Sequence, residues 1–238
     1  AFRVAGVHHT INYSRGEAEA NWLKAHQPDV WDRTRHYLLL SGYLNHRLCG
    51  RFVDSVGSQV AYLPFDYKRL AWAAKSDWKW QALAVKAEWL PELVAPGTRM
   101  GAITPEASAA TGIPEGTPLM AAAADKACEV IGAGCQQPHI GCLSYGTTAT
   151  INTTSNKYME VTPFIPPYPS AIPGAYSTEV QIFRGYWMVN WFKQQFGHHE
   201  QNQSAQTGVS PEVLFDELVN SVPPGSMGLT LQPYWPPG

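Results

Sequence analysis

The chain has 238 residues, 45% of them hydrophobic and 15% charged, and its 17 basic and 19 acidic side chains give a net charge of −2. This composition supports a packed core and excludes a disordered chain, while the balanced charge offers no basic field for nucleic acid or an anionic membrane. Apolar runs such as 118–124 are far shorter than the roughly 20 residues of a membrane span. The length fits one large domain or two small ones, with neither nucleic acid nor a membrane as a partner.

Local signals predict alternating helices and strands. A capping box at Ser14–Glu17 opens a helix over 14–25, which Pro28 ends. Thr104 as N-cap, with Pro105 at the first helical position, opens a helix that ends at Gly112. Further helices are expected over part of 32–49 ending near Gly50, over 77–87, over 126–133 closed by Gly134, over 185–196 with Trp187, Met188, Trp191 and Phe192 inward, and from Ser210 onward.

Strand signals gather in the second half of the chain. The apolar run 118–124 is expected to be a fully buried strand, and a final strand is expected near 228–232. Residues 140–145 and 148–154 are expected to pair around the tight turn Tyr145-Gly146-Thr147. Two stretches are expected as loops, the proline-rich 163–174 and the polar 198–208.

The cysteines and histidines predict no metal site. None of the cysteines stands in a C-x-x-C pair, and we expect them to be reduced and mostly buried: Cys49, Cys128, Cys135 and Cys142. The neighbours in the pairs His8-His9 and His198-His199 would point to different faces of a helix or strand. No apolar segment typical of a signal peptide opens the chain, so we expect a cytoplasmic protein, with a processed secreted protein as the alternative.

Asp125 is the first candidate for chemistry. It follows the apolar run and precedes a helix, and ligands in α/β sheets bind outside the carboxyl ends of strands. A carboxylate at that point can accept a proton from a substrate hydroxyl. The alternative is an ordinary helix N-cap, which Asp serves well.

Other candidates have equally ordinary alternatives. The turn within Ser144–Thr148 carries a glycine and two threonines, which suits a phosphate but also an ordinary hairpin. Glu179 precedes a helix and would bind sugar hydroxyls or be a solvated strand residue. Asp54 and Asp66 would shape a pocket or form turns.

Four stretches form an ordered set along nearly the whole chain: NWLKAHQPDVW with HYLLLSGYLNHRLCG and Asp54; LPELVAPGTRMGAITPEASAATGIPEGTPLMAAAADKACEVIGAG; LSYGTTATI; and VPPGSMGLTLQPYW. In this order they resemble the motifs of the FGGY family of carbohydrate kinases, within the actin-like ATPase superfamily. The family patterns that they resemble include "Y-L-x-x-R-L-T-G", "T-G-[LI]-x-x-G-x-P-V-x-x-G-x-x-D" and the phosphate hairpin "S-x-G-T-[ST]".

By position, the resemblance implies roles for single residues. Asp125 would be the catalytic base that deprotonates the acceptor hydroxyl. Lys126 stands where many members have Gln or Asn, so it would bind the substrate or turn outward, and Glu179 would lie near the sugar. The ATP phosphates would face three residues of the hairpin: Gly146, Thr147 and Thr148. Tyr186 replaces a glycine that is common after Gly185 in the family.

The family's "D-x-G-T-x-x-x-R" and "G-G-G-x-x-S" segments are not found in this chain, which also begins without Met and ends on Pro-Pro-Gly. The resemblance therefore implies a central fragment, poorly active alone. Its fold would be α/β, with two partial ribonuclease-H-like lobes. Residues 1–135 would be the C-terminal part of the sugar-binding lobe, and 136–238 the N-terminal part of the nucleotide-binding lobe.

The function implied by the resemblance is the ATP-dependent phosphorylation of a sugar or polyol, of the pentulose, pentose or polyol type. ATP and Mg2+ would be the cofactors, with a small-molecule sugar or polyol as partner. Family members are often dimers, so a homodimer is compatible with the resemblance. The alternative from another class is a non-catalytic carbohydrate-binding protein, which the aromatic content and Glu179 would serve.

Overall fold

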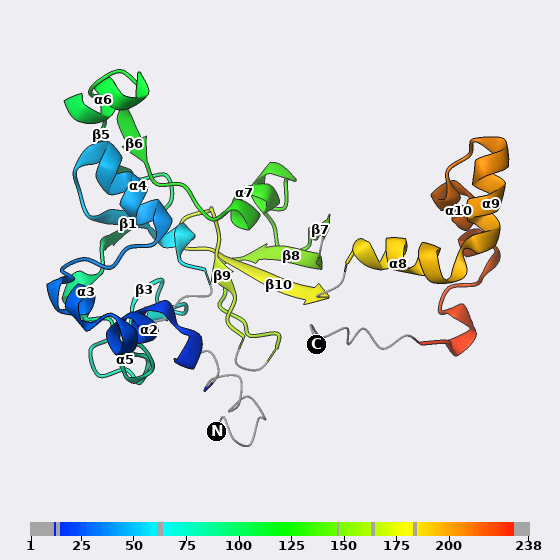
Figure 1. The fold of residues 1–238 in the computed structure, drawn as a ribbon, viewed down its shortest axis with the longest axis horizontal. Helices are drawn as coiled ribbons and strands as arrows, with labels where there is room; N and C mark the ends of the chain where they lie inside the picture. Colours follow the sequence, from blue (N-terminus) through cyan, green and yellow to red (C-terminus); the bar gives the residue numbers. More distant parts are fainter. Residues whose placement is uncertain are drawn as a thin grey trace. The chain divides into compact units, whose positions relative to one another are not determined.

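The computed structural model describes residues 12, 15–60, 64–146, 148–162, 165–182 and 185–230. Contacts divide the chain into a first unit, Ala1–Ile140 with Thr153–Thr178, and a second unit, Gly141–Asn152 with Glu179–Gly238. Each unit combines helices with short strands (Figure 1), so the predicted α/β class is confirmed.

The first unit carries most of the helices: α2 (Glu19–His26), α3 (Pro28–Arg33), α4 (Leu40–Cys49), α5 (Lys79–Ala82), α6 (Pro105–Thr111), α7 (Asp125–Gly132), and the 3-10 turns η1 (Val56–Ser58) and η2 (Ala87–Trp89). Capping signals explain several boundaries. The hydroxyl of Thr104 accepts a hydrogen bond from the Ala107 amide at 3.2 Å, and Gly112 ends α6 with a φ of 78°. Gly50 likewise ends α4, with a φ of 72°. These predicted ends are confirmed.

The strands of the first unit are short and form separate pairs: β1 (Val53–Ser55) with β4 (Glu92–Val94), β2 (Phe65–Asp66) with β3 (Ala71–Trp72), and β5 (Arg99–Ala102) with β6 (Pro118–Met120). The first pair is parallel and the other two are antiparallel. Two buried clusters hold these elements together. Trp31 packs edge-on against Trp89 at 4.9 Å between ring centroids, while Val53 and Met100 belong to the cluster below α4.

One larger sheet has the strand order β7 (Cys142–Tyr145), β8 (Ala149–Ser155), β10 (Tyr176–Ile182) and β9 (Tyr168–Pro169). The predicted hairpin is confirmed, because β7 and β8 pair antiparallel from Cys142↔Asn152 to Tyr145↔Ala149. Strand β7 and residues 149–152 of β8 belong to the second unit, and residues 153–155 of β8 belong to the first.

The remaining helices belong to the second unit: α8 (Trp187–Phe196), α9 (His198–Thr207), α10 (Pro211–Ser221) and the 3-10 turn η3 (Ser226–Gly228). The rings of Phe192 in α8 and Phe215 in α10 meet edge-on at 5.8 Å. Lys193 and Glu212 add an ion pair of 2.6 Å between the same helices. Ser210 caps α10 through its hydroxyl, which accepts from the Val213 amide, as the sequence predicts.

Several predicted elements are wrong. The helix over 77–87 is only the four residues of α5, followed by extended chain and η2, and the loop over 198–208 is helix α9. The run 118–124 is a strand only at Pro118–Met120, and Met120 is 48% exposed in this two-stranded pair. No residue of α8 is buried, so its aromatic face does not point inward.

Smaller differences concern the ends of segments. Pro28 opens α3 rather than simply ending the helix before it, because proline fits the first helical position. The proline-rich loop contributes β9 to the sheet, and residues 228–230 form no strand. Ser14 of the predicted capping box and residues 231–232 lie outside the described residues.

All four cysteines are free; three are buried and Cys128 is exposed. Among the helices of the described residues, none has the length and apolar character to cross a membrane.

Candidate active site

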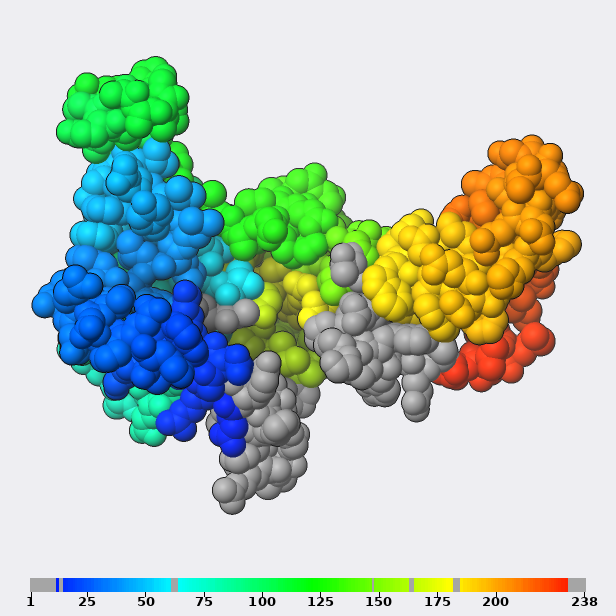
Figure 2. All heavy atoms as spheres, viewed as in Figure 1, coloured from blue at the N-terminus to red at the C-terminus, as the bar shows by residue number. Residues whose placement is uncertain are grey.

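Asp125 is the first residue of α7 and is exposed. The N-cap of this helix is Ala124, without a side-chain cap, so the alternative of Asp125 as N-cap is not what the structure has. The carboxylate accepts a hydrogen bond from the Lys126 amide at 2.7 Å. Figure 2 shows α7 (green, in the middle of the view) at the surface of the molecule. A surface carboxylate at a helix N-terminus is free to meet a substrate hydroxyl.

The segment that leads to Asp125 is tied to the corner between β1 and η1, formed by residues 55–57. The hydroxyl of Ser55 donates to the carbonyl oxygen of Ala122 at 2.5 Å. The amide of Ala124 donates to the carbonyl oxygen of Gly57 at 2.8 Å. Gly57 has no room for a side chain, because a Cβ there would lie 2.7 Å from the Cβ of Ala123. Two bonds and one close packing contact therefore fix the backbone just before Asp125.

Asp54 directly precedes this corner in the chain and is 1% exposed. Its Oδ1 accepts from the Ser55 amide at 2.7 Å and from Asn45 Nδ2 at 3.3 Å. Its Oδ2 accepts from Ser41 Oγ at 2.7 Å and from Gln59 Nε2 at 3.3 Å. Burial raises the pKa of Asp54, and these hydrogen bonds oppose the rise. Asp54 is thus a buried strand residue and not a turn former.

Lys126 extends along its own helix. Its Nζ lies 2.6 Å from Glu129 Oε2, one helical turn further on, and both side chains are partly exposed. Lys126 follows Asp125 in the chain, and its ammonium group pairs with Glu129 along α7.

The tip of the β7–β8 hairpin brings Gly146 and Thr148 together, since the Gly146 amide donates to the carbonyl oxygen of Thr148 at 2.9 Å. Thr147 lies outside the described residues. The segment before α8 docks on this tip, where the Tyr186 amide donates to the carbonyl oxygen of Gly146 at 2.8 Å. A Cβ on Gly185 would lie 2.4 Å from the carbonyl carbon of Thr148, so only glycine fits there.

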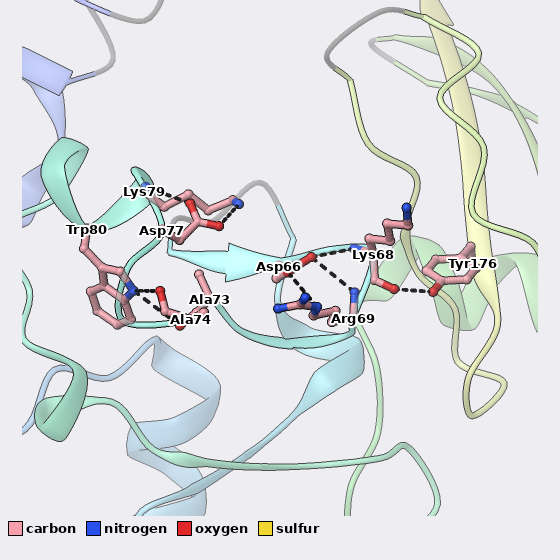
Figure 3. Close-up of polar contacts among 9 residues, drawn as sticks. All are labelled: Asp66, Lys68, Arg69, Ala73, Ala74, Asp77, Lys79, Trp80 and Tyr176. Carbon is pink, nitrogen blue, oxygen red and sulfur yellow. Dashed lines mark hydrogen bonds and ion pairs between the residues drawn. The ribbon is translucent and has the colours of Figure 1, made fainter.

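The other two candidate carboxylates, Glu179 and Asp66, lie in different kinds of local structure. Glu179 lies in β10 and is half-buried. Asp66 is a turn former, because its Oδ1 accepts from the amides of Lys68 and Arg69 at 3.0 and 3.2 Å (Figure 3). Figure 3 also shows Tyr176, whose hydroxyl donates to the carbonyl oxygen of Lys68 at 2.8 Å.

The predicted residues fall in both units. Asp125 and Lys126 belong to the first, and Gly146, Thr148 and Glu179 to the second. Among the described residues, no group of three or more His, Cys, Asp or Glu side chains could hold a metal ion.

Comparisons with known proteins show the family of the chain. The model of the N-terminal domain of the FGGY family of carbohydrate kinases matches residues 16–132, which include Asp54 and Asp125. The "Uncharacterized sugar kinase YgcE" of Escherichia coli (strain K12) is 33% identical over 79% of this chain and 38% of its own length. The chain belongs to the FGGY family of carbohydrate kinases. A xylulose kinase of Lactococcus lactis is a second relative, 27% identical over 90% of this chain and 40% of that protein.

Solved structures of FGGY kinases show the same fold. The xylulose kinase from Rhodospirillum rubrum superposes with a TM-score of 0.76, at 20% identity, over 96% of this chain and 49% of that one. The predicted fold, that of the actin-like ATPases, is therefore confirmed. The chain spans about two fifths of the length of the curated relatives that it matches.

Sequence reasoning missed three residues of this FGGY chain that shape the site. Ser55 and Gly57 form the corner that holds the segment before Asp125, and Gly185 supports the hairpin tip. A small residue directly after the buried Asp54 was the available signal for the corner. For Gly185, the signal was a glycine just before a helix that carries no other small residue in its first turn.

Proposed function

We propose that the protein phosphorylates a hydroxyl of a sugar or polyol with ATP, and that Asp125 is the general base. The observation that carries this proposal is Asp125 itself, an exposed carboxylate at the start of α7 in a chain of the FGGY family.

The reaction would need little covalent chemistry from the protein. Asp125 takes the proton of the acceptor hydroxyl, whose oxygen forms a bond to the γ-phosphorus of ATP. The bond from that phosphorus to the bridging oxygen breaks, and ADP leaves with the electron pair. Phosphoryl transfer depends mainly on positioning and on charge stabilisation, so the rigidity of the backbone before Asp125 matters.

We assign the ATP phosphates to the hairpin tip, with Gly146, Thr147 and Thr148 as the contacts. Gly146 supports this role because close packing does not explain why a glycine occupies this position. It is exposed, and a Cβ there would meet no atom closer than 3.8 Å. A glycine without a steric reason inside the chain suits the close approach of a ligand to the backbone.

Mg2+ fits the same proposal as a metal that accompanies the nucleotide. Mg2+ is usually held by one or two carboxylates together with substrate phosphates, and not by a cage of protein ligands. Asp125, the exposed carboxylate at the start of α7, is a residue of the kind that could contribute such a ligand. When bound, Mg2+ neutralises charge on the phosphates.

For the substrate we propose a pentulose, pentose or polyol, with Lys126 and Glu179 among the residues that bind it. Two of the curated relatives are xylulose kinases and others are an autoinducer-2 kinase and an L-fuculokinase, so xylulose is the first sugar to test. We further propose that residues 1–135 belong to the sugar-binding lobe and 136–238 to the nucleotide-binding lobe. A cytoplasmic location and a homodimer complete the proposal.

The experiment is a coupled assay of ADP release by the full-length protein, with pentuloses, pentoses, hexoses and polyols offered in turn. The account predicts turnover with at least one of them that depends on both ATP and Mg2+. Calorimetry with the same sugars, with and without ATP and Mg2+, measures sugar and nucleotide binding. It distinguishes the proposed kinase from the alternative, a non-catalytic carbohydrate-binding protein. Sugar binding that ignores nucleotide, with no nucleotide binding at all, would favour that alternative.

A further inference from the structure

We propose that Asp54 and Ser55 are positioning residues, which hold the backbone of the segment 122–124 and thereby set the place of Asp125. Neither residue is assigned to contact substrate. The effect on turnover rests on the proposed function, whereas the effect on the backbone does not.

The first step of the argument is the charge of Asp54. A carboxylate that is 1% exposed is costly to bury, and such groups normally pair with a cation. Within the described part of the chain, Asp54 forms no ion pair, and all its donors are neutral. The burial of this carboxylate among neutral donors points to a role in fixing the backbone, since an apolar residue would be less costly to bury.

The second step is what those hydrogen bonds fix. Ser41 and Asn45 come from α4, and Gln59 follows η1, so Asp54 joins α4 to the corner at residues 55–57. Its shortest backbone contact is the Ser55 amide at 2.7 Å. The Asp54 carboxylate therefore sets the orientation of Ser55.

The third step leads from Ser55 to Asp125. The Ser55 hydroxyl accepts from the Gly57 amide at 3.1 Å and donates to the carbonyl oxygen of Ala122 at 2.5 Å. The Gly57 carbonyl oxygen then accepts from Ala124, the residue before Asp125. The N-cap residue of α7 is Ala124, whose side chain cannot accept a hydrogen bond from the first turn of the helix. The corner therefore holds the residues just before α7, where the helix has no capping side chain.

The test compares Ser55→Ala and Asp54→Asn with a matched control in the full-length protein. Tyr176→Phe is the control, since it also deletes one buried hydroxyl that donates to a main-chain carbonyl within the first unit. Hydrogen exchange of the peptide covering residues 121–128 is measured first, because it needs no activity. We expect exchange there to become about fivefold faster or more in Ser55→Ala, which loses the hydrogen bonds of the hydroxyl to Ala122 and Gly57, and unchanged in Tyr176→Phe.

Kinetics on an accepted sugar give the second readout. We expect kcat of Ser55→Ala to fall about 10-fold to 100-fold, with KM for sugar and ATP within about twofold, because a misplaced base slows the chemical step without touching binding. Asp54→Asn, which keeps the side-chain volume, should change both readouts in the same direction. If Ser55→Ala does not fold, Asp54→Asn decides the test.

Unchanged exchange at residues 121–128 in the folded variants would overturn the inference, as would equal changes in Tyr176→Phe. A fall in kcat matched by an equal rise in KM would also contradict it. If the wild-type protein phosphorylates no sugar while exchange increases as expected, the positioning role stands and the proposed function fails.

Discussion

Gly185 lies so close to Thr148 that a Cβ on it would be 2.4 Å from the carbonyl carbon of that residue, against the tip of the β7–β8 hairpin. The contact is with backbone, which cannot move aside as a flexible side chain does. We expect Gly185→Ala to lower the free energy of unfolding by about 1–3 kcal/mol, as overpacking does. Urea unfolding checks this, with Gly141→Ala as control, because its Cβ would meet only the Ile151 side chain at 3.5 Å. Equal stability of Gly185→Ala and wild type would contradict the contact.

Gly146 should respond in the opposite way. Its Cβ would make only an ordinary van der Waals contact, 3.8 Å from the carbonyl oxygen of Thr148, so we expect Gly146→Ala to change the free energy of unfolding by less than about 1 kcal/mol. If the phosphates of ATP approach this backbone, the same change raises KM for ATP about tenfold or more, because a methyl group occupies the path. Steady-state kinetics with varied ATP provide the measurement. An unchanged KM for ATP would contradict the assignment of the ATP phosphates to the hairpin tip.

Lys126 offers a test of substrate contact. If the Lys126 ammonium group donates a hydrogen bond to the bound sugar, its loss lowers the affinity for the sugar about tenfold or more. Lys126→Met should therefore raise KM for the sugar by that factor. Glu129→Gln is the matched control, since it breaks the same exposed ion pair without removing the ammonium group. Both variants should unfold within about 0.5 kcal/mol of wild type, because exposed pairs contribute little. If Lys126→Met leaves KM for the sugar unchanged, Lys126 serves only the helix surface.

The raised pKa of Asp54 gives the protein a pH dependence of known sign. The carboxyl of an unfolded Asp has a pKa of about 3.9. Burial raises the pKa of Asp54 in the folded state. Between these two values the folded state binds more protons than the unfolded state, so stability falls as pH rises through this window. We therefore expect the stability of wild type relative to Asp54→Asn to be highest below about pH 4 and to decrease as pH rises. Urea unfolding at several pH values measures this difference, and a wild-type advantage that grows with pH would show the opposite sign.

The features predicted best from sequence are those that neighbouring residues determine. Thr104 with Gly112, and Gly50 alone, set helix ends through caps that need no distant partner. The β7–β8 hairpin follows in the same way from its tight turn. Asp125 could be singled out because it stands between an apolar run and a helix.

The features missed depend on distant contacts or on weak periodicity. Helix α9 is polar on all sides, so it carries no apolar stripe for a sequence pattern to detect. The role of Ser55 arises from a contact with Ala122, 67 residues away. Asp54 was recognised as a candidate, but its burial among neutral donors follows from the packing of α4 against β1 and not from its neighbours in the chain.

The central claim is that Asp125 removes the proton from the acceptor hydroxyl, and Asp125→Asn tests it most directly. The amide keeps the size of the side chain and cannot act as a base. On a sugar that the full-length wild-type protein accepts, the coupled ADP-release assay should show kcat reduced about 100-fold or more, with an unfolding midpoint close to that of wild type. Turnover at the wild-type rate in folded Asp125→Asn would contradict the account.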